Sequence, residues 1–200
     1  SDLDKKKAGV YREAALSHGI PARPNGLIPH DDPLLKQLEK SKTTMPFEKH
    51  ILFWGVDGTP AADGATNVAL HADEGYTHGD SACIGRGLDF RYYWDSISLK
   101  VVGAVRYSRR AVGGWSALGR ADSLDGSNAW GNSLVHGGCV ETVLDELTAE
   151  VMKINISPEM VTSEIRVKLK RPSEPGQTYR AEAQISDVSP PRVTITGKIS

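Results

Sequence analysis

The chain has 200 residues, of which 39% are hydrophobic and 24% are charged, and its formal net charge at pH 7 is −1. This length fits one domain, or one domain with a large extension. The near-neutral charge gives no reason to expect nucleic acid or an anionic membrane as the main partner. No apolar run approaches the roughly 18 residues that a membrane-spanning helix needs.

The first part of the chain, residues 1–89, predicts short helices and loops. One helical pattern covers 11–16, and a second lies in "DDPLLKQLEKSK", where Asp32 is placed to cap a helix that begins at Pro33. The run "HILFWGV" is compatible with a short buried strand. Residues 57–87 are rich in Gly, Asp, Ala and Thr and show no period. A loop that long serves a function or contacts a partner.

The rest of the chain, residues 90–200, has more regular patterns. Apolar residues alternate over 97–107, which predicts a strand, and they follow helical spacing over 138–153, which predicts an amphipathic helix. A glycine-rich loop, 113–135, connects the two. Three extended segments with one apolar face each follow the helix, at 165–169, 179–185 and 193–199. The sequence therefore predicts an α+β fold, in which the helix covers one face of an antiparallel sheet.

The helix begins with an unusual group, His136-Gly137-Gly138, and carries two acids, Glu141 and Asp145. Two glycines let another backbone approach closely and leave the first N–H groups bare, where they favour a developing negative charge. Asp145 follows two turns later as a carboxylate that can activate water or attack directly. The alternative is a tight turn followed by solvated acids on an exposed helix face.

The stretch "HGGCVETVLDE" resembles the His-Gly-Gly-(six residues)-Asp signature of hot-dog-fold acyl-CoA thioesterases, of the phenylacetyl-CoA and human thioesterase-superfamily type. Residues 161–185 are similar to the next two strands and the turn of that family, and 92–108 are loosely similar to the strand before the loop. The resemblance covers about residues 90–200 and implies a long helix wrapped by a curved antiparallel sheet. Residues 1–89 resemble no family and form an irregular N-terminal extension.

The resemblance also implies roles for individual residues. Asp145 corresponds to the general base or nucleophile, and an N–H of Gly138 or its neighbour to the oxyanion donor. His136 would orient the turn or contact the thioester, and Thr162 would assist from a second subunit. The substrate-binding residues implied are Gly137, Asn132, Arg166, Lys168 and Arg171. The basic residues, together with Lys170, either meet the phosphates of coenzyme A or form a solvated strand face.

The family forms homodimers or dimers of dimers with active sites at the subunit interface. The resemblance implies no metal or redox cofactor, and coenzyme A enters only as part of the substrate. Two features depart from the family: the N-terminal part is long, and we expect the last strand of the family to be absent from residues 90–200. We therefore expect hydrolysis of acyl-CoA thioesters, or alternatively a non-catalytic subunit of a larger complex in which another chain supplies that strand.

Two kinds of residue near the motif have open roles. Cys139 is either a reactive thiol activated by the helix start or a small packing residue. Trp94, Trp115 and Trp130 flank the glycine-rich loop and either line an acyl pocket or anchor the packing.

The compartment follows from the thiols. Cys83 and Cys139 fit neither a zinc spacing nor a disulfide framework, which favours an intracellular, reducing compartment. The first residues are too polar for a secretory signal peptide, and the sequence starts with Ser1 instead of Met, which is compatible with a removed leader. We expect the cytoplasm, or a mitochondrion or another organelle.

Overall fold

The computed structural model describes residues 2–16, 26–47, 50–52, 67–69, 82–112 and 134–200. In these residues the elements follow the order α1 (Asp2–Leu16), α2 (Pro33–Lys40), β1 (Thr44–Phe47), β2 (His50–Leu52), β3 (Asn67–Ala69), a π-helical turn (Ala82–Arg86), β4 (Leu88–Asp95), β5 (Lys100–Tyr107), a 3₁₀ turn (Arg109–Ala111), α5 (Gly137–Asn155), β6 (Thr178–Ser189) and β7 (Arg192–Ile199).

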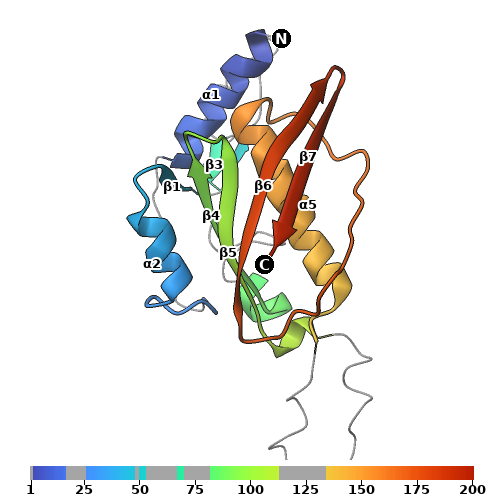
Figure 1. Cartoon of the computed structure of the whole chain (residues 1–200). Helices are drawn as coiled ribbons and strands as arrows, with labels where there is room; N and C mark the ends of the chain where they lie inside the picture. Colours follow the sequence, from blue (N-terminus) through green and yellow to red (C-terminus); the bar gives the residue numbers. More distant parts are fainter. Residues whose placement is uncertain (1, 17–25, 48–49, 53–66, 70–81, 113–133) are drawn as a thin grey trace, which may run out of the picture.

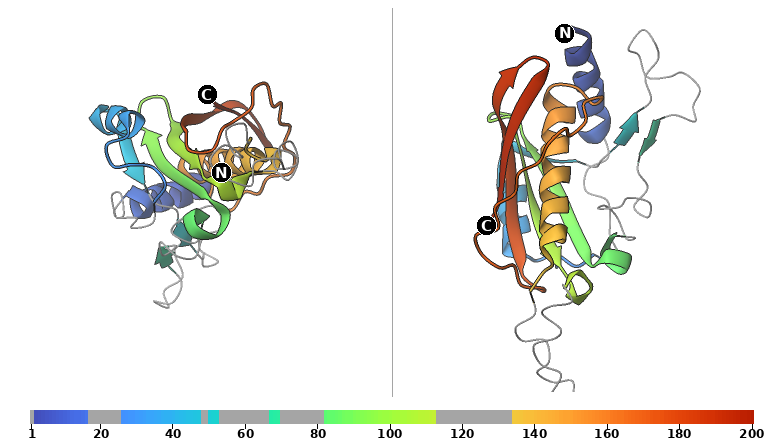
Figure 2. Two further views of the ribbon diagram at one scale, coloured as in Figure 1. Left: turned by 90° about the horizontal axis from the view of Figure 1, so that it is seen from below. Right: turned by 90° about the vertical axis from the view of Figure 1, so that its right-hand side faces the viewer.

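Five strands form one antiparallel sheet in the order β1-β4-β5-β6-β7, and α5 lies across one of its faces (Figures 1 and 2). Strands β2 and β3 form a separate pair. A long helix against a curved antiparallel sheet is the hot-dog arrangement, so the predicted fold class is confirmed. The helix predicted over 138–153 is also confirmed, with ends at Gly137 and Asn155.

The core lies between α5 and the sheet. The apolar face of α5 is fully buried at Val143, Leu147, Val151 and Ile154. It packs against alternate residues of the central strands, among them Phe90, Val101, Val105 and Ala181. The apolar residues of α5 recur with the helical period and those of the strands at every second position, so each element has one apolar face. These faces pack together in a single apolar layer. This layer fixes α5 relative to the strands and so positions the start of the helix.

Helix α1 packs against the C-terminal half of α5 (Figure 1). It begins at Asp2, so it is longer than the helix predicted over 11–16. The Tyr11 hydroxyl donates to the fully buried carboxylate of Glu150 at 2.6 Å, and Arg12 donates to the Ile154 carbonyl at 2.8 Å. These contacts tie the N-terminal part of the chain to the central helix.

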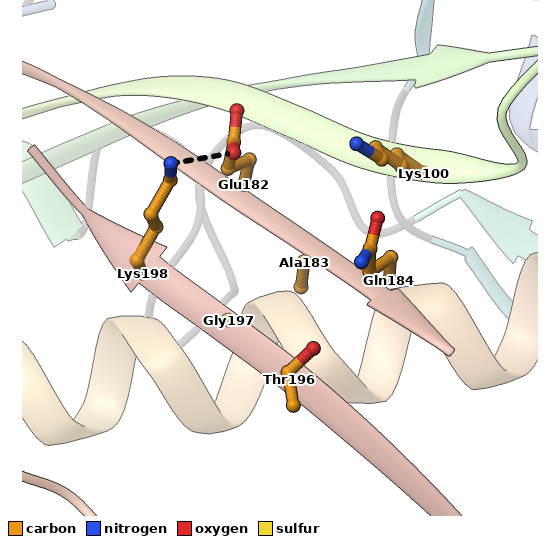
Figure 3. A pocket seen from close by; sticks show the side chains of 7 residues that line it. All are labelled: Lys100, Glu182, Ala183, Gln184, Thr196, Gly197 and Lys198. Atoms are coloured by element: carbon orange, nitrogen blue, oxygen red, sulfur yellow. Dashed lines mark ion pairs between the residues drawn. The ribbon is translucent and has the colours of Figure 1, made fainter. Parts of the chain in front are cut away.

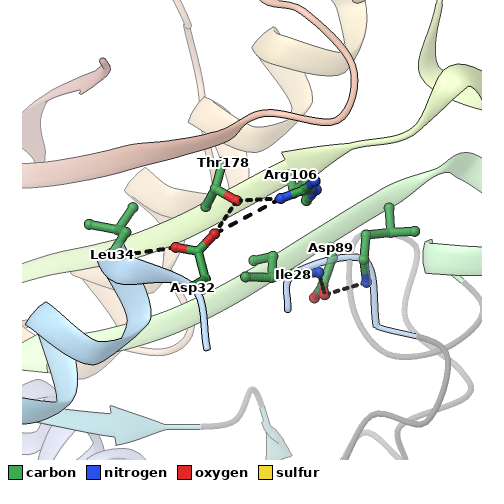
Figure 4. Close-up of polar contacts among 7 residues, drawn as sticks. Ile28, Asp32, Leu34, Asp89, Arg106 and Thr178 are labelled. Atoms are coloured by element: carbon green, nitrogen blue, oxygen red, sulfur yellow. Dashed lines mark hydrogen bonds and ion pairs between the residues drawn. The ribbon is translucent and has the colours of Figure 1, made fainter. Parts of the chain in front are cut away.

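Helix α2 covers the opposite face of the sheet, over β4 and β5. Leu35 and Leu38 pack there on Tyr93, Val102 and Ala104. The predicted cap is confirmed, because the Asp32 carboxylate accepts the Leu34 N–H at 2.9 Å. Two further polar contacts hold this segment down (Figure 4): Thr178 donates to Asp32 at 2.7 Å, and Asp89 accepts the Ile28 N–H at 3.0 Å.

The segment before residue 90 thus contributes to the same sheet. Strand β1 pairs with β4, from Thr44 opposite Asp95 to Phe47 opposite Tyr92. The domain boundary expected between residues 89 and 90 stays a prediction. Strand β1 belongs to the main sheet although it precedes that boundary. Only 50–52 of the strand expected in "HILFWGV" are described, as β2, and most of residues 57–87 lie outside the described residues.

Two of the strand predictions were wrong in detail. The strand expected over 97–107 begins at Lys100, because Asp95 accepts the N–H groups of Ile97 and Ser98 and turns the chain there. The segment 165–169 forms no strand at all. Its alternation remains, but a strand also needs a neighbour for its backbone, and no described strand pairs with it. The other two extended segments are confirmed as β6 and β7.

Candidate active site

The start of α5 is built around His136, which is the N-cap residue. Its Nδ1 accepts the Gly138 N–H at 3.0 Å, and its carbonyl accepts the Cys139 N–H at 2.9 Å. An accepting Nδ1 is an unprotonated nitrogen. Gly137, the first residue of the helix, has an N–H with no hydrogen-bond partner among the described residues. The bare donor is therefore that of Gly137, the neighbour of Gly138.

Both glycines lie where a side chain would meet an obstacle. A Cβ on Gly137 would come within 2.9 Å of the Leu169 Cδ1, and one on Gly138 within 3.0 Å of the His136 Nδ1. Leu169 therefore covers the helix start closely. The turn itself is fixed from both sides, because His136 N–H donates to the Ala111 carbonyl at 2.9 Å and Val135 N–H to the Ser173 carbonyl at 2.8 Å.

Asp145 lies two turns further along α5 and is half-buried. The Thr162 hydroxyl donates to its Oδ1 at 2.9 Å, whereas Oδ2 has no hydrogen-bond donor among the described residues. This geometry leaves one carboxylate oxygen able to accept a proton from water. Thr162 was expected from a second subunit, but the contact here comes from the same chain. Glu141 is exposed and no contact of its side chain is seen in the described part of the chain.

A cavity of about 250 Å³ lies beside the helix start. Its walls come from two segments, Leu134, Val135, Gly137 and Val140 on one side and Leu169 to Ser173 on the other. Lys170 and Arg171 line it, so two cations flank a mostly apolar space. Of the other expected substrate-binding residues, Lys168 is exposed outside this cavity and Arg166 is paired with Glu164 at 2.7 Å. Asn132 lies outside the described residues.

Cys139 and Trp94 take packing roles. Burial raises the pKa of the Cys139 thiol, which keeps it protonated, and the residue packs against the main core. Trp94 lies at the other end of α5, where its Nε1 donates to Asn155 at 3.1 Å and Arg12 stacks over its ring. Trp115 and Trp130 lie outside the described residues.

A second cavity, of about 210 Å³, opens on the sheet over β6 and β7 (Figure 3). Its polar lining includes Lys100, Gln184 and Thr196, and Lys198 pairs there with Glu182 at 3.1 Å. These side chains lie on the sheet face opposite α5 (Figure 3), so this cavity is separate from Asp145 and the helix start. The described residues contain no group of three or more potential metal ligands.

The sequence of this region matches a known family. The model of the thioesterase superfamily matches residues 132–200. Residues 132–200 therefore resemble the thioesterase superfamily, which agrees with the hot-dog arrangement of the structure. The match begins just before the His136 turn and includes α5, Asp145, Thr162, β6 and β7. It covers less than half of the chain, and in the structure the sheet of the matched region continues into earlier strands, because β6 pairs with β5 and β5 with β4.

A search of curated proteins gave no match to the chain. Among the described helices, none combines the length and the apolar character that crossing a membrane requires. Sequence reasoning missed one residue of the site region, Leu169, and left the oxyanion donor open between Gly138 and its neighbour. Leu169 was expected only as part of a strand face, and a histidine at the N-cap, which occupies the Gly138 N–H, was the signal that would have selected Gly137 as the donor.

Proposed function

We propose that this protein hydrolyses acyl-CoA thioesters to the free acid and coenzyme A. The observation that carries the proposal is the state of Asp145, whose Oδ1 is held by Thr162 while Oδ2 stays open, in a thioesterase domain. Asp145 takes a proton from a water molecule that attacks the thioester carbonyl. A helix-start N–H, that of Gly137, stabilises the oxyanion that forms. His136 holds the turn, and Lys170 and Arg171 attract the phosphates of coenzyme A.

The two halves of this site belong to different chains. Gly137 and Asp145 are eight residues apart on α5, which corresponds to about 12 Å along the axis. The first N–H groups of a helix also point away from its body. A carbonyl oxygen within about 3 Å of the Gly137 N–H is therefore too far from a water held by Asp145 of the same helix. We therefore expect a homodimer in which a second copy brings its own Asp145 opposite this helix start.

The decisive experiment is to measure coenzyme A release from a panel of acyl-CoAs by the wild type and by Asp145→Asn. General-base catalysis contributes roughly 10²–10⁴-fold, so we expect kcat to fall by at least about 100-fold. Glu141→Gln is the matched control, because it neutralises the other acid of the same helix, and it should keep wild-type kcat. A wild type that releases no coenzyme A, or an Asp145→Asn variant that equals it, would refute the proposal.

A second candidate function is a non-catalytic subunit of a larger complex. It is favoured by exposed apolar residues between α5 and β6: Val161 is 87% exposed, Leu169 53% and Ile165 45%. An apolar row of this kind is typical of a surface that binds another protein. Sedimentation of the purified chain separates the two functions. A symmetric dimer or tetramer that releases coenzyme A supports the enzyme, whereas an inactive chain that is stable only with other proteins supports the subunit.

A further inference from the structure

We infer that Leu169 selects the acyl group of the substrate at its second carbon, so that straight acyl chains are accepted and chains branched at C2 are rejected. The inference rests on the proposed function, because it names the substrate class of the same site. Its observation is the contact between Leu169 and the helix start. A Cβ built on Gly137 would come within 2.9 Å of the Leu169 Cδ1, so no further carbon fits between the two residues.

The distances place Leu169 beside the reacting carbonyl. A carbon–carbon bond is about 1.5 Å long, so the Leu169 Cδ1 lies at most about 4.4 Å from the Gly137 Cα and about 6 Å from its nitrogen. A carbonyl oxygen that accepts the Gly137 N–H lies about 3 Å from that nitrogen, and C2 of the acyl group lies two bonds, or about 2.7 Å, beyond the oxygen. Leu169 and C2 are thus within about 6 Å of one atom.

The cavity of about 250 Å³ at the helix start connects these two positions, because Gly137 and Leu169 both line it. Its other lining includes Val135 and Val140, which are each only 8% exposed. The chain of coenzyme A beyond the sulfur carries amides, and burying an amide without a hydrogen-bond partner costs free energy. An acyl chain has no such group. The acyl side of the thioester therefore enters the cavity, and a branch on C2 meets Leu169.

Leu169 is the wall of this cavity that can be changed without disturbing the core. Val135 and Val140 belong to the main core cluster, whereas the Leu169 side chain is 53% exposed. One carbon more or less in an apolar pocket changes kcat/KM by roughly 10–200-fold. The wall is an exposed side chain that can shift, so we expect a selectivity near the lower end of this range.

Three isomeric substrates test the selection: pentanoyl-CoA, 3-methylbutanoyl-CoA and 2-methylbutanoyl-CoA, which differ only in the place of the branch. We expect kcat/KM of the wild type to be at least about ten-fold higher for pentanoyl-CoA than for 2-methylbutanoyl-CoA, and Leu169→Ala to reduce this ratio at least about five-fold. The intrinsic reactivity of each thioester is the same with every variant, so a changed ratio reports the wall. Rejection of 3-methylbutanoyl-CoA as strong as that of the 2-methyl isomer would overturn selection at C2.

Ile165→Ala is the matched control. Ile165 is an apolar residue of the same segment and is 45% exposed, but it does not line the cavity. This variant should keep the ratio of the wild type within about two-fold. A ratio that stays the same in Leu169→Ala, or that both variants reduce equally, would overturn the inference.

Binding tests the same wall without any reaction. Ketone isosteres of pentanoyl-CoA and 2-methylbutanoyl-CoA, in which a CH₂ group replaces the sulfur, keep the carbonyl and cannot be hydrolysed. By titration calorimetry we expect the wild type to bind the straight isostere at least about five-fold more tightly, and Leu169→Ala to bind both alike. Equal affinities for the wild type, or no binding of either isostere, would overturn the inference. A wild type that cleaves none of the three thioesters would instead refute the proposed function, so the two failures are distinguishable.

Discussion

The glycine at the start of α5 makes a contact that a double-mutant cycle can measure. A Cβ on Gly137 would lie 2.9 Å from the Leu169 Cδ1, which is the tip of an exposed side chain. We expect Gly137→Ala to cost about 1 kcal/mol of unfolding free energy in the wild type and close to nothing in a Leu169→Ala background. Urea denaturation of the four proteins measures this, and an equal cost in both backgrounds would show that backbone conformation requires the glycine.

The thiol beside this turn should be unreactive. Burial raises the pKa of Cys139 above its ordinary value of 9.0, so the reactive thiolate is scarce at neutral pH. We expect modification by a disulfide reagent at pH 7.5 to be slower in the folded protein than in the same chain in guanidinium chloride. Cys83→Ser isolates the residue, because Cys83 is the other thiol. Modification as fast as that of the unfolded chain would favour the reactive alternative.

One of the contacts between helix α1 and the central helix is made by a buried carboxylate. Glu150 is 0% exposed and accepts hydrogen bonds from Tyr11 at 2.6 Å and from Lys153 at 2.8 Å. Tyr11→Phe removes one hydrogen bond to this buried carboxylate, so it should lower the unfolding free energy by roughly 1–3 kcal/mol. Tyr179→Phe is a control, because its hydroxyl bonds exposed groups. Equal losses would mean that burial of the carboxylate does not matter.

Residues 158–172, which follow α5, take a conformation that their sequence pattern does not predict. Alternating apolar and basic residues favour a strand, yet this segment runs along α5 with its apolar side chains largely exposed. Its position follows from the end of α5 and from the contact between Thr162 and Asp145. Neither constraint is visible in a local period, since the partner residue lies 17 positions earlier in the chain.

Stability of the whole molecule should fall in acid. Burial alone would raise the pKa of Glu182, but hydrogen bonds and charge attraction from Lys198 and Arg180 outweigh it and hold the pKa below the ordinary 4.5. Because the pKa of Glu182 is lower in the folded state, the ionised carboxylate stabilises the fold above pH 4.5. This contribution is lost as the pH falls through the folded-state pKa. We expect the urea concentration at the unfolding midpoint to decrease as the pH is lowered below 4.5. The decrease should be less steep in Glu182→Gln. An equal slope in both proteins would contradict this assignment.

The sequence predicted the central helix and the last two strands, but neither the placement of α2 nor strand β4 from its pattern. The helix over 138–153 and the strands at 179–185 and 193–199 followed from their periods, because each has one face in the common core. The placement of α2 on the opposite face of the sheet could not be predicted. It depends on hydrogen bonds between distant segments, in which Asp89 accepts an N–H and Asp32 accepts a hydroxyl. Strand β4 was seen only as a loose resemblance, because it is buried on both faces and so hardly alternates.

The sequence carried the local information: the period of α5, the His-Gly-Gly turn, the position of Asp145 and a resemblance that the superfamily match over residues 132–200 confirmed. Tertiary structure decided which groups meet. It placed Thr162 on the Asp145 of its own chain, occupied the Gly138 N–H with His136 and left that of Gly137 bare. The physical reason is that periods and caps depend on neighbours within a few residues, whereas a hydrogen bond between segments depends on where the packed core brings them.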